Sequence, residues 1–137
     1  MKKILLLSLS VLLLSGCSDK NNYEAAVLAE LERDAKNAGE KDYKIPNEKM
    51  AECIVEASSQ NMHGIFALDP ERLMAYRNYT KMLTVAQSPD PKKTMEELRN
   101  DFGSVKELVA ARSNYVESHM ECESSFVVNT EPVESEK

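Results

Sequence analysis

Apolar residues recur every three to four positions along most of this chain, and that spacing restricts the folds it can adopt. Over residues 105–122, for example, Leu108, Ala111, Tyr115 and Cys122 fall on one face of a helix. No segment shows the strict alternation of apolar and polar residues that a half-buried strand requires. The sequence therefore predicts an all-α fold, a small bundle of about four to five helices.

Local start and stop signals divide this pattern into five helices. Pro70 and Pro91 each follow an aspartate, as expected where an N-cap residue precedes the first helical position. Ser104 and Glu107 have the spacing of a capping box. The expected helices cover roughly residues 22–38, 46–63, 70–87, 91–100 and 105–123.

The last of these helices has a second apolar stripe beside the first. This stripe consists of Val105, Val109, Val116 and Met120. A helix that is apolar over such a wide arc usually lies at the centre of a bundle. We therefore expect the helix over residues 105–123 to be the central one.

The N-terminal residues have the organisation of an export signal. Lys2 and Lys3 supply a positive charge, and an apolar run of 11 residues follows over 4–14, interrupted only by serines. This run is too short for a transmembrane helix, which needs about 20 residues. The small residues Ser15 and Gly16 then precede Cys17. We predict that residues 1–16 are a signal peptide that is removed.

Leu14-Ser15-Gly16-Cys17 resembles the lipobox of bacterial lipoproteins. The resemblance covers only the first 17 residues, and it implies a diacylglyceryl group on the Cys17 thiol and an acylated Cys17 amine. Two or more acyl chains anchor a protein stably in a membrane. In such lipoproteins an Asp directly after the cysteine is the signal for the inner membrane, and here that position is Ser18. The resemblance therefore favours the outer membrane, with the domain facing the periplasm.

Polar segments flank the expected bundle on both sides. Residues 17–22 are predicted to form a lipidated tether, whose extended length is less than about 20 Å. The bundle itself is expected over residues 23–126, close to the membrane. Residues 127–137 are acidic, contain Pro132 and lack periodicity, so they are predicted to be a disordered tail.

The charge balance argues against one class of partner. The chain has 17 Lys and Arg and 23 Asp and Glu. Removal of Lys2 and Lys3 with the signal peptide leaves 15 basic residues and a formal charge of −8. Nucleic acid repels a domain of this charge, and no basic patch with interleaved aromatics is present. We therefore expect no nucleic-acid partner.

Two cysteines remain once Cys17 is assigned to lipid. Cys53 and Cys122 each lie on the apolar face of their helix, and two cysteines in an exported chain usually pair. We predict a structural disulfide between them. The alternative is a zinc site, because His119 and Cys122 share a helix face, but the other histidine, His63, lies at a helix end. No metal and no cofactor are expected.

The mature domain has no residue pair that would act as nucleophile and base, so we expect a binding protein rather than an enzyme. Its architecture loosely resembles that of the pilotins, small helical lipoproteins that escort secretin subunits, although no motif is shared. The resemblance implies an adaptor or assembly factor with a groove for a partner helix. Side chains at the predicted groove are Met74, Tyr76, Tyr79, Met82 and Tyr115.

Two other functions are compatible with the same features. One is an exclusion or inhibitor lipoprotein that blocks a foreign protein through an exposed patch. The other is a small-ligand-binding bundle or an enzyme, with a cavity inside the bundle lined by His119, Tyr115 and acidic groups.

Overall fold

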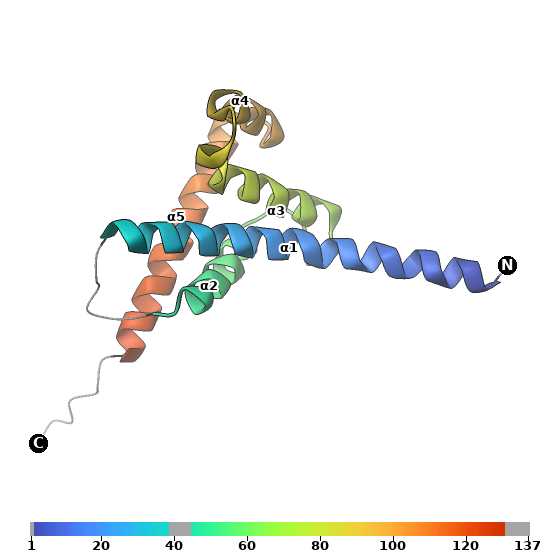
Figure 1. Cartoon of the computed structure of the whole chain (residues 1–137), viewed down its shortest axis with the longest axis horizontal. Helices are drawn as coiled ribbons and strands as arrows, with labels where there is room; N and C mark the ends of the chain where they lie inside the picture. Colours follow the sequence, from blue (N-terminus) through green and yellow to red (C-terminus); the bar gives the residue numbers. More distant parts are fainter. Residues whose placement is uncertain (1, 39–44, 131–137) are drawn as a thin grey trace, which may run out of the picture.

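The computed structural model describes residues 2–38 and 45–130 of the chain (Figure 1). Five α-helices and one short 3-10 helix account for most of these residues, and no strand occurs among them. The predicted all-α bundle is therefore confirmed. In chain order the elements are α1 (Lys2–Ala38), α2 (Asn47–Gln60), α3 (Pro70–Leu83), η1 (Val85–Gln87), α4 (Pro91–Asp101) and α5 (Val105–Thr130).

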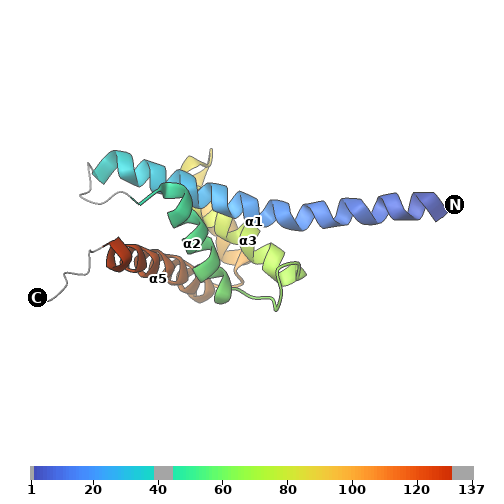
Figure 2. The same ribbon diagram turned by 90° about the horizontal axis from the view of Figure 1, so that it is seen from below.

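The helices pack around α1 and α2. The C-terminal half of α1 packs against both α2 and α3, and α5 packs mainly against α2. The short η1 helix joins α3 to α4 at one end of the bundle. The N-terminal part of α1 projects alone from the opposite end (Figures 1 and 2).

The core is built from the predicted inner faces of the helices. Tyr23 and Val27 of α1 and Ile54 of α2 are fully buried. The Tyr23 ring stacks on Tyr76, with centroids 6.0 Å apart, and meets Tyr79 edge-on at 5.5 Å. Aromatic pairs of this geometry add about 0.5–1.5 kcal/mol to the stability gained by burial alone. These rings join α1 to α3.

The extent of α1 differs from the prediction. It was expected to begin near residue 22, after a polar tether, but it begins at Lys2 and is continuous through residues 18–22. No proline interrupts this stretch, and two of its charged side chains contact the bundle: Asp19 pairs with Arg77 at 2.9 Å, and Lys20 with Glu56 at 3.8 Å. No helix in the described ranges is both long and apolar enough to cross a membrane.

The position of α5 also differs from the prediction. Its second apolar stripe, Val105, Val109, Val116 and Met120, is exposed, so α5 lies at the edge of the bundle and not at its centre. The spacing of apolar residues along a helix does not show whether the stripe that they form is buried or exposed. In this bundle α1, and not α5, packs between α2 and α3.

The C-terminal end of α5 also differs from the prediction. The helix continues to Thr130, so residues 127–130 of the expected tail are helical. Residues 131–137 of that tail lie outside the described residues.

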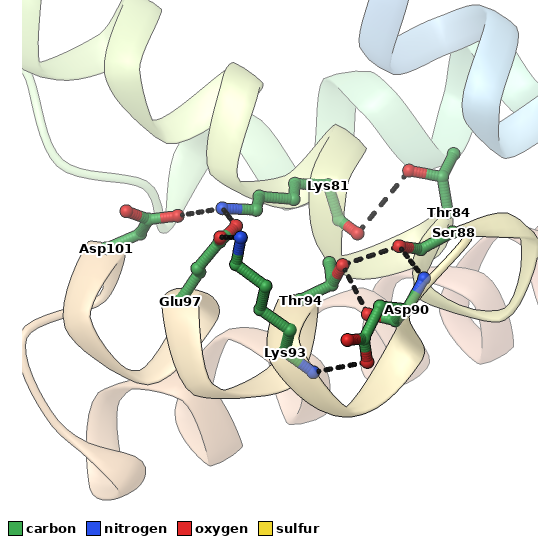
Figure 3. Close-up of polar contacts among 8 residues, drawn as sticks. All are labelled: Lys81, Thr84, Ser88, Asp90, Lys93, Thr94, Glu97 and Asp101. Carbon is green, nitrogen blue, oxygen red and sulfur yellow. Dashed lines mark hydrogen bonds and ion pairs between the residues drawn. The ribbon is translucent and has the colours of Figure 1, made fainter.

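Polar contacts hold α4 against α3 (Figure 3). The Lys81 ammonium of α3 contacts the carboxylates of Glu97 at 2.9 Å and Asp101 at 2.8 Å, both on α4. Asp90 caps α4 by accepting a hydrogen bond from the backbone N–H of Lys93 at 3.0 Å. The start predicted for this helix from its Asp-Pro pair is therefore confirmed.

A disulfide between Cys53 and Cys122 joins α2 to α5, with Cα atoms 6.0 Å apart. The predicted bridge is confirmed. Both sulfurs are bonded to each other, so neither is available as a thiolate ligand for zinc. The alternative of a metal site built from these cysteines and His119 is therefore wrong.

Candidate binding groove

A surface groove of about 610 Å³ lies where α3, α5, the end of α2 and the end of α4 meet. We call it the α3–α5 groove. Its floor is mainly apolar, and its rim carries carboxylates. The floor consists of the apolar residues Met62, Met74, Ala75, Tyr79, Phe102 and Ala111 together with Asn114, and the rim carboxylates are Glu71, Asp101, Glu107 and Glu117.

The floor is a continuation of the hydrophobic core. Met62, Tyr79 and Ala111 are buried, so they contribute to both the core and the groove. The Phe102 ring contacts Tyr79, with centroids 5.9 Å apart, and closes the end of the groove next to α4. Met74 is more than half exposed at the mouth of the groove. A flexible, polarisable methionine at this place can adapt its shape to a bound side chain.

Asn114 of α5 is the polar centre of the floor. Its side-chain NH₂ donates to the Tyr79 hydroxyl and to the Ser58 carbonyl oxygen, both at 2.9 Å. Its side-chain oxygen accepts a hydrogen bond from Asn61 at 3.0 Å. One residue thus connects α5 to α3 and to the C-terminal end of α2.

A second group of buried hydroxyls lies beneath Asn114. The Tyr23 hydroxyl of α1 shares a hydrogen bond of 3.0 Å with Ser58, and Ser59 donates to the Tyr76 hydroxyl at 3.2 Å. Burial raises the pKa of both Tyr23 and Tyr79, although their hydrogen bonds to Ser58 and Asn114 act in the opposite direction. These phenols therefore stay protonated at neutral pH and serve as hydrogen-bonding groups.

The rim is acidic. Four carboxylates line the groove, and no lysine or arginine is among its lining residues. Asp101 is neutralised by Lys81, with which it forms an ion pair. No basic side chain in the described part of the chain forms an ion pair with Glu71, Glu107 or Glu117. Three uncompensated negative charges therefore surround an apolar floor, and such a site attracts positively charged groups.

The structure brings together only part of the groove predicted from the sequence. Met74 and Tyr79 line the α3–α5 groove. Tyr76, Met82 and Tyr115 are buried in the core and do not line it. All five predicted groove residues occur at helical spacing. This spacing indicates that a side chain faces inward, but it does not show whether the side chain lies in the floor of a groove or in the core.

The polar centre and the rim of the groove were not predicted from the sequence. Asn114 is a polar residue on a helix face that is otherwise apolar. This departure from the apolar pattern is the sequence feature that could have indicated a polar contact there. The rim carboxylates come from α3, α4 and α5, and acidic residues are frequent throughout the chain. Only the packing of these helices distinguishes the rim residues from other surface acids.

The remaining candidate residues lie elsewhere. Tyr115 and His119 contact each other, with ring centroids 6.4 Å apart, and Arg112 stacks on Tyr115 at 5.4 Å. Burial, reinforced by the nearby Glu30 carboxylate, raises the pKa of Tyr115. Neither Tyr115 nor His119 lines the α3–α5 groove. Cys17, the predicted lipidation site, lies in α1, six positions before the buried Tyr23.

No protein-family model matches the sequence, and searches against curated proteins and against solved structures gave no significant match. A functional assignment therefore rests on the α3–α5 groove and on the N-terminal sequence.

Proposed function

We propose that this protein is a lipid-anchored adaptor or assembly factor that binds a partner protein in the α3–α5 groove. The observation that carries the proposal is an apolar floor bordered by Glu71, Glu107 and Glu117, with no lysine or arginine lining it. Grooves between helices bind amphipathic helices, which insert their apolar face. Here the partner would place apolar side chains against Tyr79 and Met74 and basic side chains beside the rim.

The side chains on the floor support binding rather than catalysis. Asn114 and Tyr79 are hydrogen-bonded to each other, and Asn114 is also bonded to the Ser58 backbone. A raised pKa makes Tyr79 a poorer source of a phenolate nucleophile or base. The same side chains form a preorganised surface, which lowers the entropic cost of binding a partner.

The lipobox resemblance supports a lipid anchor at Cys17, and Ser18 supports the outer membrane as its location. Because α1 is helical from Cys17 onward, the distance between Cys17 and the bundle is short. Tyr23, which is buried, follows Cys17 by six positions, which corresponds to about 9 Å of helix. The bundle would therefore lie directly at the membrane surface, at a shorter distance than an extended tether would allow. A partner located at the same membrane surface could bind in the groove, and the bundle would not need to extend across the periplasm.

Photo-crosslinking in intact bacteria tests the proposal. A benzophenone amino acid replaces Met74 or Ala110 in the groove, or Val128 or Glu52 outside it; all four positions are exposed. We expect an adduct with one defined protein from the two groove positions and none from the two control positions. Equal adducts from all four positions, or none from the groove, would contradict the proposal. Cys17→Ala should weaken the adduct because it removes the lipid that holds the bundle at its membrane.

A further inference from the structure

The loop between α2 and α3 exposes three large apolar side chains. Ile65 is 93% exposed, Phe66 62% and Leu68 47%. They occupy three of the four consecutive positions 65–68, and the fourth is Ala67. Isolated apolar residues are common on protein surfaces, but a cluster of this kind indicates an interaction site.

The conformation of this loop is fixed by hydrogen bonds. The Asp69 carboxylate accepts from the backbone N–H groups of Ile65 and Glu71, each at 3.0 Å. The Asp69 N–H donates to the Phe66 carbonyl oxygen at 3.0 Å. From the other side, the Arg72 guanidinium donates to the Gly64 carbonyl oxygen at 2.6 Å and to the Ser59 carbonyl oxygen. The polar groups of the loop therefore turn inward, and its apolar side chains stay outside.

Gly64 permits this arrangement. It has a φ of +94°, and a Cβ atom at this position would lie 2.7 Å from the Arg72 backbone nitrogen and from its Cβ. The chain thus passes close to α3 at Gly64 before it turns outward at Ile65. The exposed residues follow directly after this close approach.

The loop lies at the end of the bundle from which the N-terminal part of α1 projects. Both views show the start of α3, and the loop before it, at this end (Figures 1 and 2). The ion pair between Asp19 of α1 and Arg77 of α3, at 2.9 Å, ties the two elements together. Cys17 precedes Asp19 by two residues in the same helix. A membrane that holds the lipid of Cys17 would therefore be on the same side as the loop.

We propose that Ile65 and Phe66 insert into the lipid bilayer as a second contact beside the lipid of Cys17. This inference rests on the lipid anchor of the proposed function. The mature chain has a formal charge of −8, so its net charge does not attract it to anionic headgroups, and the exposed apolar side chains are what the loop offers to a membrane. Aliphatic and aromatic side chains are suited to the boundary between headgroups and acyl chains. Two contacts also restrict the tilt of the bundle, so they limit the orientations of the α3–α5 groove relative to the membrane.

Tryptophan fluorescence in vesicles tests the inference, because the chain contains no Trp and one introduced residue is the sole reporter. The full chain is produced in bacteria with its own signal and extracted from the membranes. It is then reconstituted into vesicles of phosphatidylethanolamine, phosphatidylglycerol and acyl-brominated phosphatidylcholine. Phe66→Trp and Ile65→Trp report on the loop. Val128→Trp, on an exposed residue near the end of α5, is the control.

We expect the brominated lipid to quench both loop tryptophans at least about twofold more than the control and to leave this ratio unchanged in high salt. Equal quenching at all three positions in vesicle-bound protein would overturn the inference and leave the anchor intact, with the loop then available to a protein partner. A chain that does not float with the vesicles and has no lipid mass on Cys17 would overturn the anchor, and the inference with it. Circular dichroism of each variant checks that the exposed substitutions leave the bundle folded.

Discussion

The side-chain nitrogen of Asn114 lies 2.9 Å from the Tyr79 hydroxyl and donates a hydrogen bond to it. Tyr79 belongs to the aromatic core around Tyr23, and Asn114 belongs to the floor of the α3–α5 groove. The shape of the groove and the stability of the bundle are therefore connected through this pair. Substitutions that loosen the core on one side should also change the surface offered to a partner.

Asn114→Ala should destabilise the bundle by about 1–3 kcal/mol, because it leaves the Ser58 carbonyl oxygen without its side-chain donor and removes a partner of Tyr79. Ser113→Ala changes the neighbouring exposed residue and should stay within about 0.5 kcal/mol of wild type. Urea denaturation followed by circular dichroism measures both. Equal free energies of unfolding for the two variants would show that the Asn114 contacts do not stabilise the fold.

The two glycines with positive φ form a second matched pair. Gly103 has a φ of +83° with no atom within 4 Å of an added Cβ, so Gly103→Ala should cost only about 1–2 kcal/mol of backbone strain. Gly64→Ala carries a similar strain and also forces its Cβ against Arg72. It should therefore cost clearly more. Thermal unfolding of both variants tests this order, and the reverse order would contradict the close approach of the loop to α3.

Loss of the disulfide should lower the free energy of unfolding by about 4 kcal/mol, a chain-entropy estimate for the loop that the bridge closes. Cys53 and Cys122 are 69 residues apart, so the bridge restricts much of the unfolded chain. The measurement compares urea unfolding of wild type and of Cys53→Ala/Cys122→Ala, with and without a reductant. Reductant should weaken the wild type and leave the double variant unchanged. A wild type insensitive to reductant would argue against a structural bridge.

Glu30 should make stability depend on pH. Burial raises its pKa above the ordinary value of 4.5, although Arg112, 3.6 Å away, acts in the opposite direction. The folded chain therefore holds the Glu30 proton more tightly than the unfolded chain does, and stability falls as pH rises from about 4.5 through the raised pKa. Glu30→Gln cannot titrate, so its stability relative to wild type should increase from about pH 4 to about pH 7. A difference that stays constant or decreases would contradict the raised pKa.

The starts of α2, α3, α4 and α5 could be predicted from the sequence because each depends on a few neighbouring residues. Asp69 and Asp90 cap α3 and α4, and Ser104 accepts the Glu107 N–H at 3.1 Å at the start of α5. The start of α1 could not be predicted in this way. A short polar stretch is compatible with either a tether or a helix, and the contact of Asp19 with Arg77, 58 residues away, helps to hold it as a helix.

The arrangement of the helices in the bundle and most of the groove residues could not be predicted from the sequence pattern. The two stripes of α5 have equally apolar residues, and only the tertiary packing buries Ala111 and exposes Val109. Likewise, Tyr79 and Tyr115 have similar spacing, but only Tyr79 lines the groove that α3 and α5 form with the ends of α2 and α4. The disulfide could be predicted because elimination left one pair of inward-facing cysteines.

In the proposed function, the acidic rim of the α3–α5 groove recognises a partner. The most direct measurement is the yield of the in-cell adduct from the benzophenone at position 74 after charge reversal of the rim. Glu107→Lys/Glu117→Lys should reduce the yield about tenfold or more, because two attractive contacts become repulsive. Glu32→Lys/Glu52→Lys changes the total charge equally at exposed residues outside the groove and should leave the yield unchanged. Equal yields from the two double variants would contradict the claim.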